Sequence, residues 1–136
     1  QAQIMALLQE LQEERHMGLI LITHDLGVVA DVADRIAVMY TGRLVETAEV
    51  HELYARPAHP YTKGLLDSIP RLDQKGQTLA AIGGLPPNLL RIPPGCPFNP
   101  RCHMARDVCR TDLPPLHEVT PGRFSACHYA EEVINA

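Results

Sequence analysis

The stretch Leu19-Ile20-Leu21-Ile22-Thr23-His24-Asp25-Leu26 decides the fold that we predict for this chain. Its aliphatic residues 19–22 form an unbroken run, which is typical of a strand covered on both faces in a parallel sheet. Asp25 can cap a helix predicted over residues 26–34 by accepting backbone N–H bonds. A second aliphatic run follows at residues 36–39. Strand, helix and strand in such close succession predict a βαβ unit.

The sequence on either side of this unit predicts the remaining elements of an α/β fold. Apolar residues before it recur at helical spacing, and the sequence after it contains a tight turn at Thr41-Gly42. The further predictions are a helix over residues 1–12, a hairpin that returns over residues 43–46, and helices over residues 49–56 and 61–68.

The second half of the chain differs from the first in composition. Residues 1–69 contain two of the twelve prolines and no cysteine, whereas residues 70–136 contain the other ten prolines and all four cysteines. Proline interrupts both helices and central strands. We therefore predict an irregular extension without long helices or central strands, which the cysteines would staple.

Charge and hydropathy exclude several classes of function. The formal net charge is −4, and basic residues are not concentrated in one segment, which argues against nucleic acid as the main partner. No window contains the roughly 18 unbroken apolar residues of a membrane span, so we expect any contact with a membrane protein to be peripheral. The opening residues have the pattern of a helix and not of a signal peptide, which suggests a piece of a longer protein.

His24 is the first candidate functional residue. It follows one predicted strand and precedes a helix, and ligands of open α/β sheets bind beyond the carboxyl ends of the strands. The alternative is a turn histidine without a special role. The segments Leu19-Ile20-Leu21-Ile22-Thr23-His24-Asp25-Leu26 and Asp34-Arg35-Ile36-Ala37-Val38-Met39-Tyr40 resemble the switch-histidine region of ABC transporter ATPases. This resemblance covers about residues 1–56. It implies a P-loop ATPase fold in which His24 contacts the γ-phosphate of ATP.

Other motifs of that ATPase family are absent from these 136 residues. No G-x-x-x-x-G-K-[ST] loop is present to hold the phosphates, and the signature and acidic segments are missing as well. ATP and Mg²⁺ would therefore bind only in the intact protein. We predict that this chain alone neither binds ATP tightly nor hydrolyses it.

The cysteines are the second candidate site. Cys96, Cys102, Cys109 and Cys127 are separated by five, six and seventeen residues, which is neither a zinc knuckle nor a common ferredoxin spacing. An iron–sulfur cluster, a zinc ion, two disulfides and unpaired thiols all remain open, although a cytosolic location would disfavour disulfides. His103 and His128 each adjoin a cysteine and could replace one ligand.

A second resemblance lies in the proline-rich half. The segments Ala58-His59-Pro60-Tyr61-Thr62-Lys63-Gly64-Leu65-Leu66 and Pro94-Gly95-Cys96-Pro97-Phe98-Asn99-Pro100-Arg101-Cys102, with Cys109 and Cys127-His128, resemble the C-terminal extension of oligopeptide/dipeptide importer ATPases. This match covers about residues 57–130. Some members of that family carry a [4Fe–4S] cluster on four such cysteines. The resemblance therefore implies a metal site on these four residues, with zinc as the less expected occupant.

Together the resemblances predict two regions: residues 1–56 as the C-terminal piece of a nucleotide-binding domain, and residues 57–136 as an importer extension. The implied partners are a second ATP-binding subunit and transmembrane permease subunits at the cytoplasmic face of the bacterial inner membrane. Dipeptides, oligopeptides, nickel and opines remain open as cargo. Two other hypotheses are a stand-alone iron–sulfur or zinc protein and a docking module. Uncovered sheet edges also predict self-association of the isolated chain.

Overall fold

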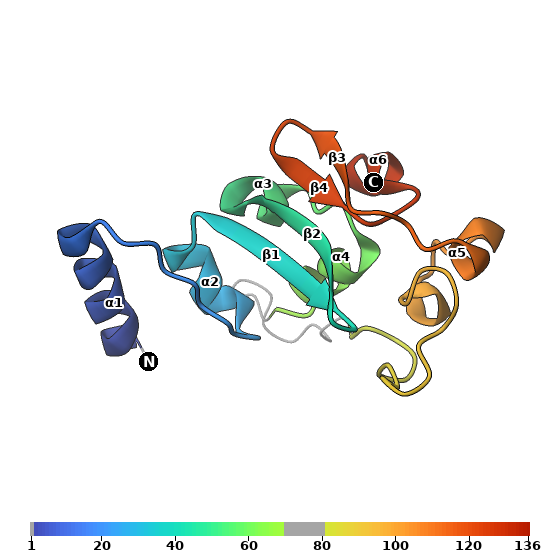
Figure 1. Ribbon diagram of the computed structural model, residues 1–136, viewed down its shortest axis with the longest axis horizontal. Coiled ribbons are helices and arrows are strands. Elements are labelled where there is room, and N and C mark those ends of the chain that lie inside the picture. Colours follow the sequence, from blue (N-terminus) through green and yellow to red (C-terminus); the bar gives the residue numbers. More distant parts are fainter. Residues whose placement is uncertain (1, 70–80) are drawn as a thin grey trace, which may run out of the picture. The chain divides into compact units, whose positions relative to one another are not determined.

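The computed structural model describes residues 2–69 and 81–136 of the chain (Figure 1). These residues form two compact units, one comprising residues 1–33 and the other residues 34–136. None of the helices in the described part is long and apolar enough to cross a membrane.

The first unit contains two helices. α1 spans Ala2–Arg15, which confirms the predicted N-terminal helix, and it ends before His16 adopts a positive φ of 50°. α2 spans Leu26–Val32. The Asp25 carboxylate caps it, because Oδ1 accepts hydrogen bonds from the backbone N–H groups of Gly27 and Val28 at 3.0 and 3.2 Å.

The predicted strand over residues 19–22 is not formed. These residues pair with no strand in the described part of the chain, and Ile20 and Ile22 are 91% and 95% exposed. The predicted βαβ unit is therefore wrong for this structure. A parallel strand obtains its hydrogen bonds from neighbouring strands, and every strand of the described residues lies in the other unit, where the pairing is antiparallel.

The second unit is built on a four-stranded antiparallel sheet with the order β1-β2-β4-β3 (Figure 1). β1 (Arg35–Tyr40) and β2 (Arg43–Glu49) form the predicted hairpin. Its turn residues Thr41 and Gly42 both have positive φ, 50° and 79°, as a two-residue turn that matches the strand twist requires. In β1 the alternate residues Ile36, Val38 and Tyr40 are buried, so one face of the strand packs on the core.

The region beyond residue 70 is more regular than predicted. β3 (His117–Thr120) and β4 (Arg123–Ser125) form a second hairpin, and β4 lies between β2 and β3. The prediction that prolines exclude a central strand is therefore wrong. The prolines flank the strands and do not occupy them, since Pro121 lies between β3 and β4 and Pro115 precedes β3. The proposed division at residue 56 stays a prediction.

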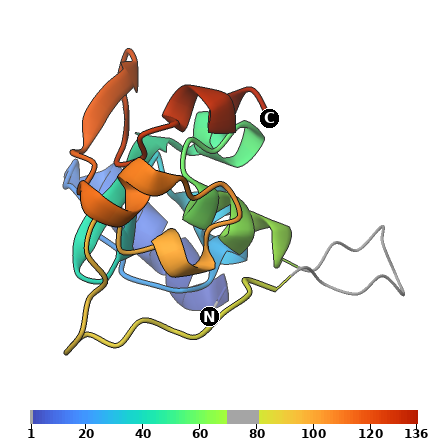
Figure 2. The same cartoon turned by 90° about the vertical axis from the view of Figure 1, so that its right-hand side faces the viewer.

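Short helices pack around this sheet. The predicted helices at residues 49–56 and 61–68 are confirmed as α3 and α4, and Figure 2 shows α6 beside α3. Arg56, which follows α3, donates hydrogen bonds to the backbone oxygen of Ile134 and to the side chain of Asn135, at the C-terminal end of α6. The helices are α3 (Val50–Ala55), α4 (Pro60–Asp67), the 3₁₀ turn η1 (Asn99–Arg101), α5 (Asp107–Thr111) and α6 (Ala130–Ile134).

An ion pair lies inside this unit. Glu46 of β2 is fully buried, and its Oε2 accepts hydrogen bonds from the backbone N–H of Ala58 at 2.8 Å and from Arg123 of β4 at 3.4 Å. Arg123 also donates to the backbone oxygen of Arg56, and Ser125 donates to that of Ala58 at 2.7 Å. Burial raises the pKa of Glu46, although these hydrogen bonds oppose the shift. The pair joins three chain segments that are distant in sequence.

Candidate functional site

His24 lies between Thr23 and Asp25, just before α2, and is exposed to solvent. Among the described residues no hydrogen bond to its ring is formed, while the Asp25 backbone N–H binds the Thr23 hydroxyl at 3.0 Å. Because residues 19–22 form no strand here, His24 does not end a strand as predicted. Its contact with a phosphate stays a prediction.

The four cysteines, in contrast, are brought together. Cys96, Cys102, Cys109 and Cys127 all line one small cavity of about 20 Å³. Cys96 lies in the loop before η1, and Cys102 directly follows η1. Cys109 lies in α5, and Cys127 lies in the segment after β4. None of the four forms a disulfide in the structure. The tertiary structure thus converts an irregular spacing in sequence into a single cluster of thiols.

Gly95 permits two of these cysteines to approach each other. The backbone N–H of Cys96 donates to the carbonyl oxygen of Cys109 at 2.8 Å. At this point Gly95 has a φ of +75°, and a Cβ added to it would lie 2.4 Å from the same oxygen. Only glycine fits such a close backbone approach without displacement. Gly95 therefore allows the backbone of Cys96 to contact the backbone of Cys109 in α5.

Backbone N–H groups face three of the sulfurs. The N–H of Tyr129 donates to Sγ of Cys127 at 3.4 Å. In the same way Phe98 and Asn99 direct N–H groups at Cys96, and Met104 and Ala105 direct theirs at Cys102. Such donors stabilise a thiolate more than a neutral thiol, and they are common around metal-bound cysteines.

Burial acts in the opposite direction on these thiols. It raises the pKa of Cys96 and Cys102 above the usual value. Burial, together with the proximity of the other cysteines, raises the pKa of Cys127 to about 12. The metal-free thiols of Cys96, Cys102 and Cys127 are therefore protonated at neutral pH. A metal that binds here has to displace their protons, so its affinity would increase with pH.

The donor set fits a thiolate-bound group in kind. No group of three or more His, Cys, Asp or Glu side chains in residues 2–69 and 81–136 has the arrangement of a metal site. A tetrahedral zinc ion with Zn–S bonds of about 2.3 Å needs its sulfurs within about 4 Å of one another. A cluster binds each cysteine through a different iron atom and tolerates a wider separation.

The two histidines beside cysteines differ in position. His128 lines the thiol cavity, but its Nε2 lies 2.8 Å from the backbone oxygen of Asp112 and is engaged there. His103 is exposed and is not among the residues that line the cavity. Neither histidine is placed as a substitute for one of the four cysteines.

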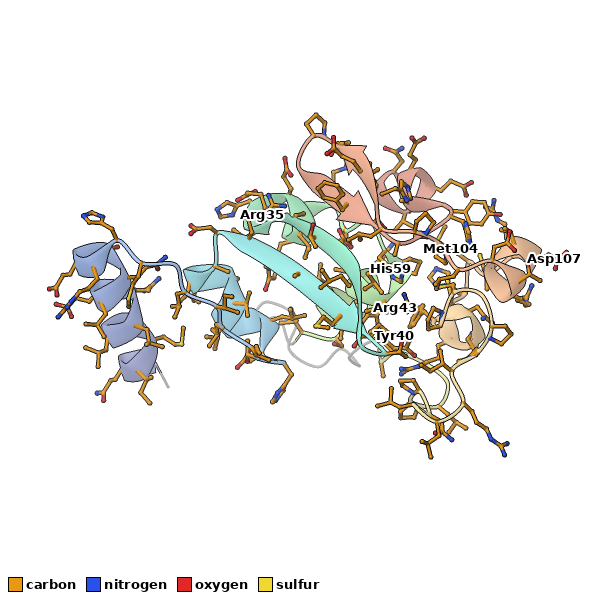
Figure 3. The ribbon with its side chains drawn as sticks, in the orientation of Figure 1. Arg35, Tyr40, Arg43, His59, Met104 and Asp107 are labelled. Atoms are coloured by element: carbon orange, nitrogen blue, oxygen red, sulfur yellow. The ribbon has the colours of Figure 1, made fainter. Side chains whose placement is uncertain are left out.

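His59, which sequence reasoning passed over, lines the same cavity. It is 1% exposed and lines the cavity together with Phe98 and with Met104, which Figure 3 labels. Its Nδ1 accepts a hydrogen bond from the backbone N–H of Tyr61 at 3.0 Å, and the ring also has a hydrogen bond with the backbone of Ala126. Burial lowers the pKa of His59 to about 4, so the ring is neutral. In sequence, the only signal for His59 is its place before Pro60, which predicts a helix cap.

A larger groove of about 460 Å³ shares part of its lining with the thiol cavity. His59, Cys96 and Phe98 line both spaces. Tyr40 and Arg43, labelled in Figure 3, contribute to the groove from the β1–β2 hairpin. The aromatic rings of Tyr40 and Phe98 meet edge to face with their centroids 5.3 Å apart. The thiol cavity is therefore supported by a packed aromatic wall.

Comparison with known proteins shows the family of this chain. Residues 45–109 match the protein family described as "Oligopeptide/dipeptide transporter, C-terminal region". Over 127 residues the chain is 53% identical to the oligopeptide transport ATP-binding protein OppD of Escherichia coli, covering 93% of this chain and 37% of that protein. The chain belongs to the oligopeptide/dipeptide transporter family.

Other relatives in this transporter family agree with that assignment. OppD of Haemophilus influenzae is 47% identical over 135 residues, covering 99% of this chain and 42% of the relative. The dipeptide transport ATP-binding protein DppD of Escherichia coli is 47% identical over 129 residues, covering 95% of this chain and 39% of the relative. The chain spans about two fifths of the length of these relatives. The family match at residues 45–109 includes Cys96, Cys102 and Cys109 and excludes Cys127 and His24.

Proposed function

We propose that the chain is the C-terminal part of the ATP-binding subunit of a bacterial importer for di- or oligopeptides, in which ATP hydrolysis drives transport. One observation carries this proposal: an identity of 47–53% extends over 93–99% of the chain in relatives named oligopeptide or dipeptide transport ATP-binding proteins. Those relatives are more than twice as long as the chain, which leaves room for the phosphate loop that the chain lacks.

In this function His24 contacts the γ-phosphate of ATP bound by the rest of the subunit. Its exposure and its place directly before the Asp25 cap support the role, because the ring is free to meet a nucleotide. The uncovered side chains of Ile20 and Ile22 also support it. Strands from the rest of the subunit would cover them and place His24 at a strand end, next to ATP and Mg²⁺.

The proposed partners follow from the same assignment. A second ATP-binding subunit would complete each nucleotide site, and transmembrane permease subunits would receive the energy of hydrolysis. The subunit would lie on the cytoplasmic face of the inner membrane, bound there through the permease.

A substitution in the full-length subunit tests the role of His24. His24→Ala should lower the rate of ATP hydrolysis by about 10²-fold or more and leave the dissociation constant for ATP nearly unchanged. His16→Ala, at another exposed histidine of the same unit, is the matched control and should retain wild-type activity. Wild-type turnover in His24→Ala would refute the assignment.

The 136-residue chain alone supplies a second test. It should show no turnover and no ATP binding at micromolar concentration, because its sequence contains no phosphate loop. Equilibrium binding of radiolabelled ATP measures this directly. Saturable binding at micromolar ATP would contradict the proposal.

We further propose that Cys96, Cys102, Cys109 and Cys127 bind a metal group, with a [4Fe–4S] cluster as the expected occupant. The shared cavity and the backbone N–H groups that face three sulfurs support this. When bound, the cluster would fasten η1, α5 and the end of β4 to one another. Anaerobically purified protein should contain iron and absorb near 400 nm. Stoichiometric zinc without iron would refute the cluster, and the absence of any metal would refute the site.

A further inference from the structure

We propose that Thr23 is a positioning residue for His24, whose hydroxyl fixes the backbone turn that carries the imidazole. The inference deepens the function proposed above and rests on it, because positioning has a catalytic effect only if His24 contacts the nucleotide. It assigns a task to a side chain that no other part of the proposed mechanism uses.

The first observation is a local hydrogen bond that spans His24. The backbone N–H of Asp25 donates to Oγ1 of Thr23 at 3.0 Å. A threonine hydroxyl that binds the backbone two residues further on takes the place of one bond of a backbone turn. The ring closed by this bond includes the backbone N, Cα and C atoms of His24. It therefore restricts the dihedral angles that set where the imidazole leaves the chain.

The residue after His24 is fixed as well. Oδ1 of Asp25 accepts the backbone N–H groups of Gly27 and Val28, which ties Asp25 to the start of α2. A Cβ added to Gly27 would lie 3.3 Å from that oxygen, so glycine leaves room for the cap. Because α2 holds Asp25, the N–H group of Asp25 is a fixed donor. The Thr23 hydroxyl links the residue before His24 to this fixed point.

The imidazole itself takes part in none of these bonds. His24 is exposed, and within residues 2–69 and 81–136 its ring forms no hydrogen bond. A catalytic group displaced by about 1 Å can lose about 10²-fold in rate, so a ring that meets a phosphate has to be placed precisely. In this segment the bonds that restrict the position of the ring act on its backbone, and the Thr23 bond is the one that encloses His24.

The test compares two variants of the full-length subunit, assembled with its transporter partners. Thr23→Val keeps the shape of the side chain but removes the acceptor, and Thr23→Ser retains the hydroxyl. We expect kcat for ATP hydrolysis to fall about 3- to 10-fold in Thr23→Val, with KM for ATP changed less than about twofold, and Thr23→Ser to stay near wild type. A lower kcat at constant KM is the pattern of an interaction that acts in the transition state.

The same substitution in the His24→Ala background separates positioning from direct contact. If Thr23 acts through His24, Thr23→Val should cause no further loss of turnover there, because no imidazole remains to be positioned. Thr120→Val, at an exposed threonine of β3, is the control for the substitution itself and should keep wild-type turnover.

Three outcomes would overturn the role of Thr23 and leave that of His24 standing. They are wild-type turnover in Thr23→Val, a loss in Thr23→Ser equal to that in Thr23→Val, and a full further loss in the double variant. Wild-type turnover in His24→Ala would overturn both roles.

Discussion

The two compact units of this chain differ in where their apolar side chains lie. In residues 34–136, β1, β2 and the aromatic side chains Tyr40 and Phe98 are packed inside. In residues 1–33 no described residue is fully buried, and aliphatic side chains such as Ile20 face solvent. A segment that exposes a continuous aliphatic run gains little from folding alone. The second unit carries its own core, whereas the first requires a surface from elsewhere.

The two units also contain different candidate sites. The first unit contains His24, whose proposed chemistry depends on a nucleotide held by other parts of the subunit. The second unit contains the thiol cavity, whose walls all come from residues 59–129. Each of the following predictions probes the contrast between a unit that needs partners and one that does not.

Removal of the buried charge in the second unit should have the largest effect. Glu46→Ala leaves Arg123 buried without its carboxylate, which typically costs about 3–5 kcal/mol of the free energy of unfolding. Urea unfolding monitored by circular dichroism measures the loss. Glu52→Ala, at an exposed glutamate of α3, is the control and should change stability by less than about 0.5 kcal/mol. Similar stabilities for both variants would show that the pair does not hold the unit together.

Acid should destabilise the second unit through His59. The folded chain keeps this ring neutral down to about pH 4, whereas an unfolded histidine takes up a proton near pH 6.5. Between these values the unfolded state binds more protons, so stability falls as the pH falls, by up to about 3 kcal/mol for this residue. Glu46 contributes with the opposite sign, because its pKa is raised by burial.

The two contributions are separated by comparison of variants. Metal-free wild type and His59→Phe are unfolded in urea at several pH values from 4 to 7. In His59→Phe, the free energy of unfolding should lack the part of its pH dependence that His59 causes. Parallel curves would show that the ring is not kept neutral by burial.

Gly95→Ala should disturb the cysteine loop. The added methyl group would collide with the Cys109 carbonyl and would occupy a positive φ, at a cost of about 1–3 kcal/mol. Gly83→Ala is the matched control, because nothing lies within 4 Å of a Cβ built at Gly83 and its φ is not positive. Thermal unfolding of both variants gives the comparison. Equal melting temperatures would exclude the close approach.

The smallest effect is expected in the first unit. Ile20→Ala should change the stability of the 136-residue chain by less than about 0.5 kcal/mol, because the side chain is 91% exposed. In the full-length subunit, the same substitution should cost about 2–5 kcal/mol if other strands cover Ile20. Hydrogen exchange of residues 19–22 in both proteins would locate the difference. No added cost in the full-length protein would contradict the proposed coverage.

Local signals in the sequence were sufficient for many elements. The turn at Thr41-Gly42 and the cap at Asp25 were predicted, since both depend on residues within three positions of each other. The strand over residues 19–22 was predicted wrongly, because a parallel strand needs partners that local pattern does not supply. β4 was missed for the opposite reason: three residues between turns have no readable periodicity.

For the candidate sites, too, the sequence predicted the residue types, whereas their arrangement depended on the tertiary structure. The four cysteines could be named from their chemistry and from the family resemblance, but their common cavity could not, because Cys96 and Cys127 are distant in sequence and Cys127 follows β4, which pairs with a remote strand. His59 could not be found at all. Its tautomer depends on the Tyr61 N–H, and its neutral state depends on burial by distant segments.

The sequence by itself determined the first four helices, the first hairpin, the thiols and the resemblance to peptide importers, because these depend on side-chain chemistry and on neighbours a few residues away. The tertiary structure alone decided that β4 is central, that Glu46 meets Arg123 across 77 positions, and that His59 is buried beside the cysteines. Desolvation is the physical reason. Whether a polar group loses water depends on which remote segments cover it, and that is settled only when the whole unit packs.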